Sequence, residues 1–195
     1  LFFCAASHGM SRCGVRAVMA AQQRIQGLVH TTPVLRSRTL DGMAGCEVLL
    51  KAENLQKTGS FKARGALNAL LALRERLGSA PAGVVTHSAG NHGQALSWAA
   101  ADQRVPCVVV VPDTAPQCKV TAIKAYGARV VVVPPAARES TAAAIAQDLG
   151  YAAIPPYDDL DVIAGQGTLA LEEFQPGGCA SSTEGAAGGG PLLVP

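Results

Sequence analysis

Short apolar runs alternate with longer amphipathic segments through the middle of the chain. The runs have the length of strands and the segments between them have the length of helices. Two runs, Cys107–Val111 and Arg129–Val133, are rich in valine, which is typical of strands buried on both faces. Strands are expected at 47–51, 83–86, 107–111 and 129–133, and helices at 60–77, 93–102, 115–126 and 138–149.

Serine and glycine mark several of the expected helix ends. Ser60 is placed to cap the helix 60–77, because a serine hydroxyl can accept a hydrogen bond from the first turn. Gly78, Gly127 and Gly150 are placed to end three helices, since glycine readily adopts the left-handed conformation that follows a helix. The regular alternation of strand and helix indicates βαβ units. The predicted class is therefore α/β, with parallel sheets and helices on both faces.

Composition and element order divide the chain into four parts. Residues 1–81 are predicted to begin a larger domain, and residues 82–157, with three strand–helix units, to form a smaller αβα domain. Residues 158–174 would return to the larger domain. Residues 175–195 are rich in glycine and proline, which is the composition of a linker, and are predicted to be disordered.

Bulk composition narrows the protein class. Of 195 residues, 49% are hydrophobic and 15% charged, so a sizeable core can be buried. The net charge of +2 and the scattered Lys and Arg residues indicate neither a nucleic acid nor an anionic membrane as partner. No apolar run is long enough to span a bilayer. The apolar start lacks a basic leader, which is unlike a signal peptide, and it lacks an initiator Met, which suggests a fragment.

The six cysteines include no Cys-x-x-Cys pair. An even number could form three disulfides, but a chain with its own core favours reduced thiols. Together with the poor leader, this predicts a cytoplasmic protein.

Lys62 is the first candidate for chemistry. It follows Thr58-Gly59-Ser60-Phe61, a tight turn that would place it in the first turn of a helix. Arg64 lies nearby, and a neighbouring cation with partial burial would lower the pKa of the Lys62 ammonium, as a nucleophilic lysine requires. The alternative is a solvated lysine on a helix surface.

A second candidate is the run from His87 to Gly93, between an expected strand and an expected helix. Its small residues allow a tight turn whose N–H groups, with the helix N-terminus, could hold a carboxylate or phosphate. Alternatives are a simple glycine-rich turn with a capping Asn91 and solvated histidines, or a metal site from His87 and His92. The spacing of these histidines fits no standard zinc pattern, so no metal site is predicted. A third, weaker candidate is Val162–Thr168, where two glycines around Gln166 before an apolar helix suggest close backbone packing.

The three candidate stretches occur in a fixed order along the chain, and together they indicate a protein family more specifically than any one of them does alone. The chain resembles the serine/threonine dehydratase and serine racemase family of fold-type II pyridoxal phosphate enzymes, to which tryptophan synthase β-like proteins also belong. The matching residues are 58–66, 86–94 and 163–168, with further agreement at 30–35, 112–116 and 125–128. The resemblance covers residues 28–173, so it implies a truncated fold-type II enzyme whose full-length form is a homodimer acting on a small amino acid.

The resemblance assigns roles by position. It implies that Lys62 carries pyridoxal 5'-phosphate as a Schiff base and acts as the base at the substrate Cα, and that Phe61 lies against the cofactor ring. Asn91 would bind the phenolic oxygen of the ring. The backbone of Ser88, Ala89, Gly90, Asn91 and His92 would hold the substrate carboxylate.

In the racemase branch, positions matching Lys57, Thr58, Gln94 and Tyr126 bind a nucleotide. The resemblance therefore implies ATP and Mg as effectors, with ordinary surface residues as the alternative.

Ala89 departs from the racemase pattern. Racemisation needs a proton carrier on each face of the planar intermediate, and serine racemases have a serine where this chain has Ala89. The expected activity is therefore that of an ammonia-lyase, or dehydratase, which converts L-serine or L-threonine to a 2-oxo acid and ammonia. Serine racemase is the alternative.

The second departure is the length of the chain. The family's glycine-rich phosphate loop is absent up to Phe174, and Gly188–Gly190 is not preceded by the buried strand that such a loop needs. Two non-enzymatic hypotheses therefore stay open. One is a truncated non-catalytic product that binds a full-length partner, and the other is a simple anion- or nucleotide-binding module.

Overall fold

The structure is a computed structural model that describes residues 13–172 and 192–194. The helices are α1 (Val15–Ile25), α2 (Arg38–Ala44), α3 (Lys62–Leu77), α4 (Asn91–Asp102), α5 (Gln117–Ala125), α6 (Arg138–Leu149) and α7 (Leu160–Leu171). The strands are β1 (Val34–Arg36), β2 (Val48–Lys51), β3 (Val84–Thr86), β4 (Cys107–Pro112), β5 (Arg129–Val133), β6 (Ala152–Ala153) and β7 (Leu192–Val194). Short 3-10 helices lie at η1 (Glu53–Leu55), η2 (Lys57–Gly59) and η3 (Pro135–Ala137).

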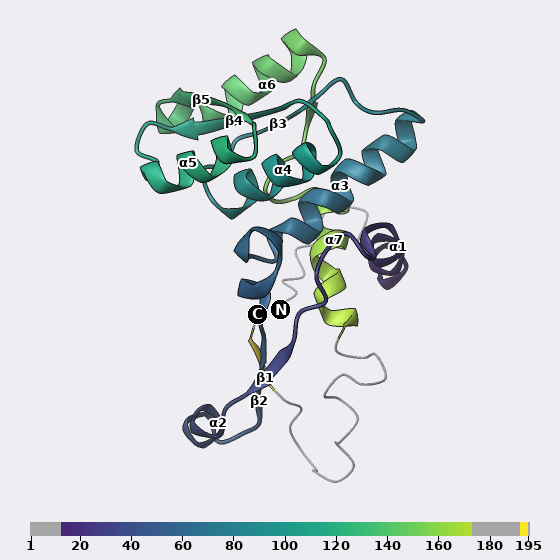
Figure 1. Cartoon of the computed structure of the whole chain (residues 1–195), viewed down its shortest axis with the longest axis vertical. Coiled ribbons are helices and arrows are strands. Elements are labelled where there is room, and N and C mark those ends of the chain that lie inside the picture. Colours follow the sequence, from purple (N-terminus) through teal and green to yellow (C-terminus); the bar gives the residue numbers. More distant parts are fainter. Residues whose placement is uncertain (1–12, 173–191, 195) are drawn as a thin grey trace, which may run out of the picture.

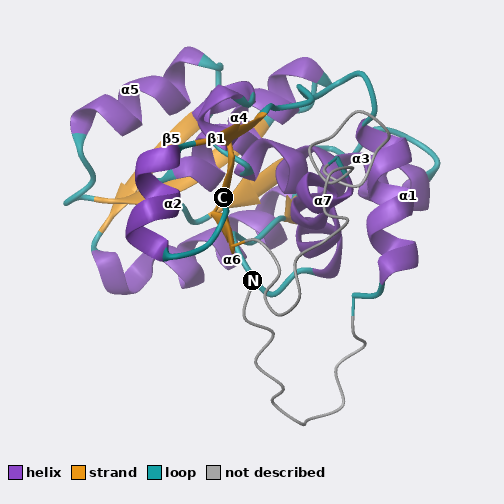
Figure 2. Cartoon of the chain, turned by 90° about the horizontal axis from the view of Figure 1, so that it is seen from below, coloured by secondary structure: helices purple, strands orange, loops and turns teal. Residues whose placement is uncertain are grey.

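Four strands form the parallel sheet that the alternating pattern predicts. The strand order is β5-β4-β3-β6, and all three pairings are parallel. Helices α4 and α5 cover one face and α6 covers the other, so the predicted α/β class with helices on both faces is confirmed (Figures 1 and 2).

Strand β4 is buried on both faces, as its run of valines predicts. Val109 and Val111 pack with residues of α4 and α5, whereas Val108 and Val110 pack against α6. Side chains alternate between the two faces of a strand, so a strand in the middle of a helix-covered sheet must be apolar at every position.

Strand β5 is the edge of this sheet, and the prediction that it is buried was wrong. Among the described strands it pairs with β4 alone, Arg129 is exposed, and 59% of Val132 is exposed. A run of valines fits an edge strand as well as a central one, and only the strand order separates the two.

A second, smaller sheet lies at the other end of the molecule (Figure 1). Strand β1 pairs antiparallel with β2, and β2 pairs in parallel with β7. Residues 192–194 belong to the tail that was predicted to be disordered, so that prediction was wrong for them. The remaining tail residues 175–191 and 195, including Gly188–Gly190, lie outside the described residues.

Helix α3 connects the two parts of the molecule. It packs against α4 of the four-stranded sheet and against α1 and α7 (Figure 1). Residues 63–70 are all buried, which accounts for the small and apolar residues on every side of this helix. The sequence patterns did not indicate α1, α2 or β1, nor the two-residue strand β6.

Most helix ends agree with the glycine signals. Gly78, Gly127 and Gly150 all have positive φ, at 67°, 82° and 64°, directly after or one residue after the helices that they end. Ser60 does not cap α3. This helix begins at Lys62, and the Ser60 hydroxyl is buried without a hydrogen-bond partner.

Helices α3 and α7 cross at two glycines. A Cβ atom on Gly165 would lie 2.6 Å from the Cα of Gly65, closer than non-bonded carbons approach. The backbone N–H of Gly65 donates to Oε1 of Gln166 at 3.1 Å. The close packing predicted for this stretch is confirmed, but Gly165 and Gly167 lie inside α7 and not before a helix.

We predict that Gly165→Ala lowers the free energy of unfolding by about 1–3 kcal/mol, because two backbones must separate to admit one methyl group. Urea unfolding followed by circular dichroism measures the change. Gly42→Ala in α2 is the matched control, since nothing lies within 4 Å of its Cβ position and alanine favours a helix. Equal effects of the two substitutions would contradict the close crossing.

Candidate functional site

Lys62 is the first residue of α3, as the sequence predicts. The chain approaches it through η1 and η2, and Thr58 in η2 has a left-handed φ of 62°. The Nζ atom of Lys62 donates a hydrogen bond to the carbonyl oxygen of Pro156 at 2.9 Å. It also lies 5.3 Å from the centroid of the Phe61 ring. Partial burial lowers the pKa of Lys62, so more of its amine is neutral and nucleophilic than in an ordinary lysine.

Arg64 does not contribute to this pKa, contrary to the sequence-based interpretation. Burial is the only cause of the lowered Lys62 pKa, and the Arg64 guanidinium is bound instead to Glu53 and Glu172. Residues two apart on a helix point in different directions, so proximity along the chain did not bring the two cations together.

The run His87–Gly93 was predicted to lie between a strand and a helix. Residues 87–90 do join β3 to α4, but Asn91, His92 and Gly93 already belong to the first turn of α4. The N–H of Gly90 donates to the Ser88 hydroxyl at 3.3 Å. A Cβ atom on Gly93 would lie 1.8 Å from the Ser88 carbonyl oxygen, so only glycine fits there. Among the described residues, the N–H groups of Asn91, His92 and Gly93 have no acceptor. These three groups, at the positive end of the helix dipole, can hold an anion.

The two residues that begin α4 differ in environment. Asn91 is exposed, whereas only 2% of His92 is exposed. His92 Nε2 lies 3.1 Å from the carbonyl oxygen of Ile154, and burial lowers the His92 pKa to about 4. The alternative of a turn with solvated histidines is therefore wrong for His92.

Five buried polar atoms on the segment before Lys62 and around the loop that leads to α4 have no hydrogen-bond partner. The two regions are neighbours, since η2 packs against α4. The atoms are Thr58 Oγ1, Ser60 Oγ, Thr86 Oγ1, His87 Nε2 and His92 Nδ1. Buried polar atoms are nearly always paired, so this group is suited to a polar ligand or cofactor.

The four positions predicted to bind a nucleotide lie on neighbouring elements. Lys57 and Thr58 belong to η2, Gln94 belongs to α4, and Tyr126 follows α5. Helix α4 packs against both η2 and α5. Within the described part of the chain, no hydrogen bond joins these four side chains to one another.

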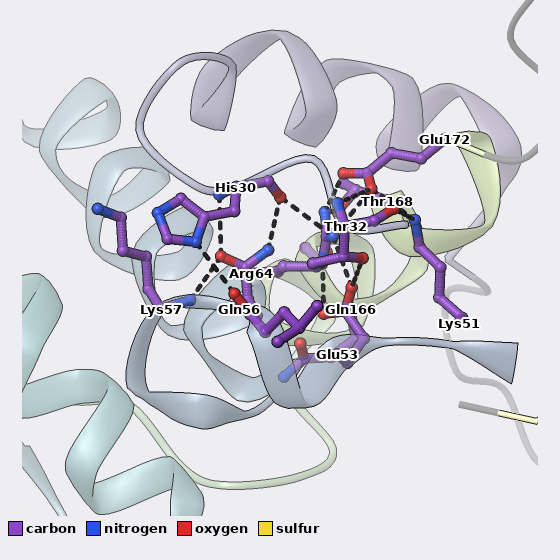
Figure 3. A network of polar contacts seen from close by, with 12 residues as sticks. His30, Thr32, Lys51, Glu53, Gln56, Lys57, Arg64, Gln166, Thr168 and Glu172 are labelled. Carbon is purple, nitrogen blue, oxygen red and sulfur yellow. Dashed lines mark hydrogen bonds and ion pairs between the residues drawn. The ribbon is translucent and has the colours of Figure 1, made fainter. Parts of the chain in front are cut away.

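A buried network of charges, which sequence reasoning missed, surrounds Arg64 of α3 (Figure 3). Arg64 is fully buried, and its guanidinium donates to Glu53 Oε2 at 2.8 Å and to Glu172 Oε2 at 3.0 Å. Lys51 Nζ donates to Glu172 Oε2 at 2.7 Å and to the Thr32 carbonyl oxygen at 2.7 Å. Two cations and two carboxylates thus neutralise one another. The sequence does contain a signal for this network. Lys51 is the last residue of an apolar strand and Glu53 lies two residues later, so both charges are close to a buried element.

The network shifts the pKa values of Arg64 and Glu172 in the directions that favour their charged forms. Burial by itself would lower the Arg64 pKa, but the hydrogen bonds and charges of Glu53 and Glu172 raise it. Burial would raise the Glu172 pKa, but Arg64 and Lys51 lower it. A polar cavity of about 250 Å³ adjoins Arg64, with Gln22 of α1 and Gln26, which follows α1, in its lining. Every nitrogen of the guanidinium already has a protein acceptor or partner, so this cavity offers no unpaired charge to an anion.

Residues 13–172 and 192–194 contain no group of three His, Cys, Asp or Glu side chains placed to hold a metal ion. In the same part of the chain no helix is long and apolar enough to cross a membrane. Four of the cysteines are described, and all four are free thiols: Cys13, Cys46, Cys107 and Cys118.

The structure thus combines a half-buried lysine of lowered pKa with a helix start whose first N–H groups have no acceptor among the described residues. Enzymes that bind a carbonyl cofactor through lysine have a reactive lysine of this kind. The model of the family "Pyridoxal-phosphate dependent enzyme" matches residues 25–185. The chain therefore belongs to the family of pyridoxal phosphate-dependent enzymes, as the sequence motifs predict.

Known relatives include both racemases and lyases. The chain is 47% identical over 165 residues to a serine racemase of Dictyostelium discoideum, with 84% of the chain and 50% of the relative covered. It is 43% identical over 178 residues to an L-threo-3-hydroxyaspartate ammonia-lyase of Pseudomonas sp, with 90% and 55% covered. A solved aspartate racemase is 54% identical with a TM-score of 0.78, and 81% of the chain and 50% of that structure are covered. The chain thus spans about half the length of these relatives.

We predict that Arg64→Met lowers the free energy of unfolding by about 3–5 kcal/mol, because buried Glu53 would lose its cation and Glu172 would keep only Lys51. Denaturant unfolding measures the loss. The control is Arg76→Met, which breaks the more exposed pair of Arg76 with Asp161 and should cost less than about 1 kcal/mol. A loss of similar size in both variants would contradict the importance of the network.

Proposed function

We propose that the chain is the cofactor-carrying part of a pyridoxal phosphate-dependent ammonia-lyase that acts on small hydroxy-amino acids. The observation that carries this proposal is the half-buried Lys62 amine, with its lowered pKa, on a segment packed against the start of α4. Unpaired buried polar atoms occur on the same segments, and they fit a polar cofactor.

Each residue has a proposed role. Lys62 would hold pyridoxal 5'-phosphate through its side-chain nitrogen, and its neutral amine would take the proton from the substrate Cα. Phe61 lies against the cofactor ring, and Asn91 binds the phenolic oxygen of the ring. The bound cofactor supplies an electron sink for the charge left at Cα.

The substrate carboxylate is held by the loop. The backbone N–H groups of residues 88–92, apart from that of Gly90, which donates to the Ser88 hydroxyl, offer donors at a helix start. An anion gains most from the helix dipole there. Burial keeps His92 neutral, so its side chain adds no positive charge there, and the backbone supplies the attraction.

In this proposal, Ala89 is the residue that favours elimination over racemisation. Its methyl group cannot exchange a proton, so no carrier stands opposite Lys62 at this position. Ser88 has a hydroxyl, but this hydroxyl accepts a hydrogen bond from the N–H of Gly90 within the loop. Loss of the substrate hydroxyl then yields a 2-oxo acid and ammonia after hydrolysis. The second candidate is racemisation, which the names of several relatives favour.

Several expectations for the whole protein remain predictions. They are the division into domains at 1–81, 82–157, 158–174 and 175–195, the homodimer, the cytoplasmic location, and an ATP and Mg effect through Lys57, Thr58, Gln94 and Tyr126. A non-catalytic role for a chain of this length is the competing hypothesis, and cofactor binding is the property that separates the two.

We predict that the purified chain, mixed with pyridoxal 5'-phosphate and reduced with borohydride, carries the label mainly on Lys62. A neutral, half-buried amine reacts faster with an aldehyde than a protonated surface lysine. Peptide mass spectrometry gives the fraction labelled at each lysine, and cofactor absorbance gives binding. Lys62→Ala should remove both signals, and Lys119→Ala, at an exposed lysine of α5, should change neither. Folded protein without preference for Lys62 would contradict the proposal.

We predict that cofactor-loaded protein forms 2-oxo acid and ammonia from L-serine or L-threonine, with little D-serine. Chiral chromatography together with a keto-acid assay measures both products. Ala89→Ser restores a hydroxyl and should raise the share of D-serine. Abundant D-serine from the unmodified chain would favour the racemase instead.

A further inference from the structure

The His92 side chain can hold only one tautomer in this structure. Its Nε2 atom faces the carbonyl oxygen of Ile154 at 3.1 Å, and a carbonyl can only accept. Because His92 is neutral, Nε2 must carry its single ring proton, and Nδ1 remains an unpaired acceptor. His92 is therefore a fixed donor in a buried place, not a solvated residue of the loop.

Ile154 is held from two directions. Its N–H donates to the Val85 carbonyl oxygen at 2.9 Å, as a continuation of the pairing between β6 and β3. Its carbonyl oxygen accepts from His92. Only 4% of Ile154 is exposed, so its backbone has little freedom to move.

Two prolines connect Ile154 to the lysine contact. Pro155 and Pro156 directly follow Ile154, and the carbonyl oxygen of Pro156 accepts the hydrogen bond of Lys62 Nζ at 2.9 Å. A proline ring fixes φ, so consecutive prolines form a stiff segment. The position of the Ile154 carbonyl therefore restricts the positions that the Pro156 carbonyl can take.

We propose that the His92 side chain is a positioning residue for Lys62, acting through the segment Ile154–Pro156. This inference rests on the proposed role of Lys62 as the cofactor-binding lysine. The His92 ring fixes the segment, and the segment fixes the Lys62 amine beside the start of α4, in the half-buried place where water is partly excluded. In the proposed function the backbone of residues 88–92 holds the substrate carboxylate. The same stretch would also position the Lys62 amine, through the buried imidazole of His92.

The experiment compares three variants by the labelling of Lys62. In each, the chain is mixed with pyridoxal 5'-phosphate at neutral pH and reduced, and the label on Lys62 is divided by that on exposed Lys119. His92→Leu keeps the size of the side chain but removes the donor. His92→Gln keeps an N–H donor that can reach the Ile154 carbonyl. Ser97→Ala removes another buried hydrogen bond of α4, from Ser97 Oγ to the Gly93 carbonyl oxygen, without touching Ile154.

We expect His92→Leu to lower the ratio about fivefold, the factor that corresponds to one buried hydrogen bond. His92→Gln should restore most of the ratio. Ser97→Ala should leave it unchanged even if its melting temperature falls, which separates positioning from general loss of stability. Circular dichroism verifies that each variant is folded.

The failures of the two proposals are distinguishable. If the unmodified chain shows no preference for Lys62, the proposed function fails. If the unmodified chain prefers Lys62 but folded His92→Leu keeps the same preference, only the role of His92 is overturned. A ratio that falls equally in His92→Leu, His92→Gln and Ser97→Ala also overturns it, because the effect then follows stability and not the donor.

Discussion

The guanidinium of Arg64 binds the carboxylates of Glu53 and Glu172, and the segments around Lys62 depend on this contact. Glu53 begins η1, Arg64 lies in the first turn of α3, and Glu172 follows α7. Lys51 at the end of β2 completes the set. Removing one charged residue of this set leaves a buried charge without its partner, which is strongly destabilising. The ion pairs therefore stabilise the geometry of the turn before Lys62. The glycine crossing of α3 and α7 brings the same elements together by close packing.

Burial, not a neighbouring cation, lowers the pKa of Lys62. The nearest arginine in sequence is fully neutralised, and desolvation alone lowers the lysine pKa. The same environment keeps His92 uncharged and its donor directed at Ile154. A partly buried environment fits the role proposed for Lys62, since an amine must be neutral to react with an aldehyde.

Racemases and lyases among the relatives share this frame. The two reactions begin with the same proton removal and differ in what happens on the opposite face of Cα. In the proposed function, one side chain on the loop between β3 and α4, that of Ala89, would decide the outcome. The same side chain also packs against the hydrophobic core, so this position serves the fold as well. Function in this family lies in a few positions on a common scaffold.

The sequence alone determined the parallel α/β sheet, the helix-ending glycines at 78, 127 and 150, the family, and the place of Lys62 at the start of α3. Each follows from local chemistry: the period of apolar residues, the φ that only glycine adopts freely, or a motif contiguous in the chain. Only the tertiary structure decided that β5 is an edge, that residues 192–194 pair with β2, that Arg64 turns away from Lys62, and that His92 is buried against Ile154. These depend on partners far apart in sequence, because strand order, helix crossing and charge pairing are set by packing between elements and leave no fixed spacing in the chain.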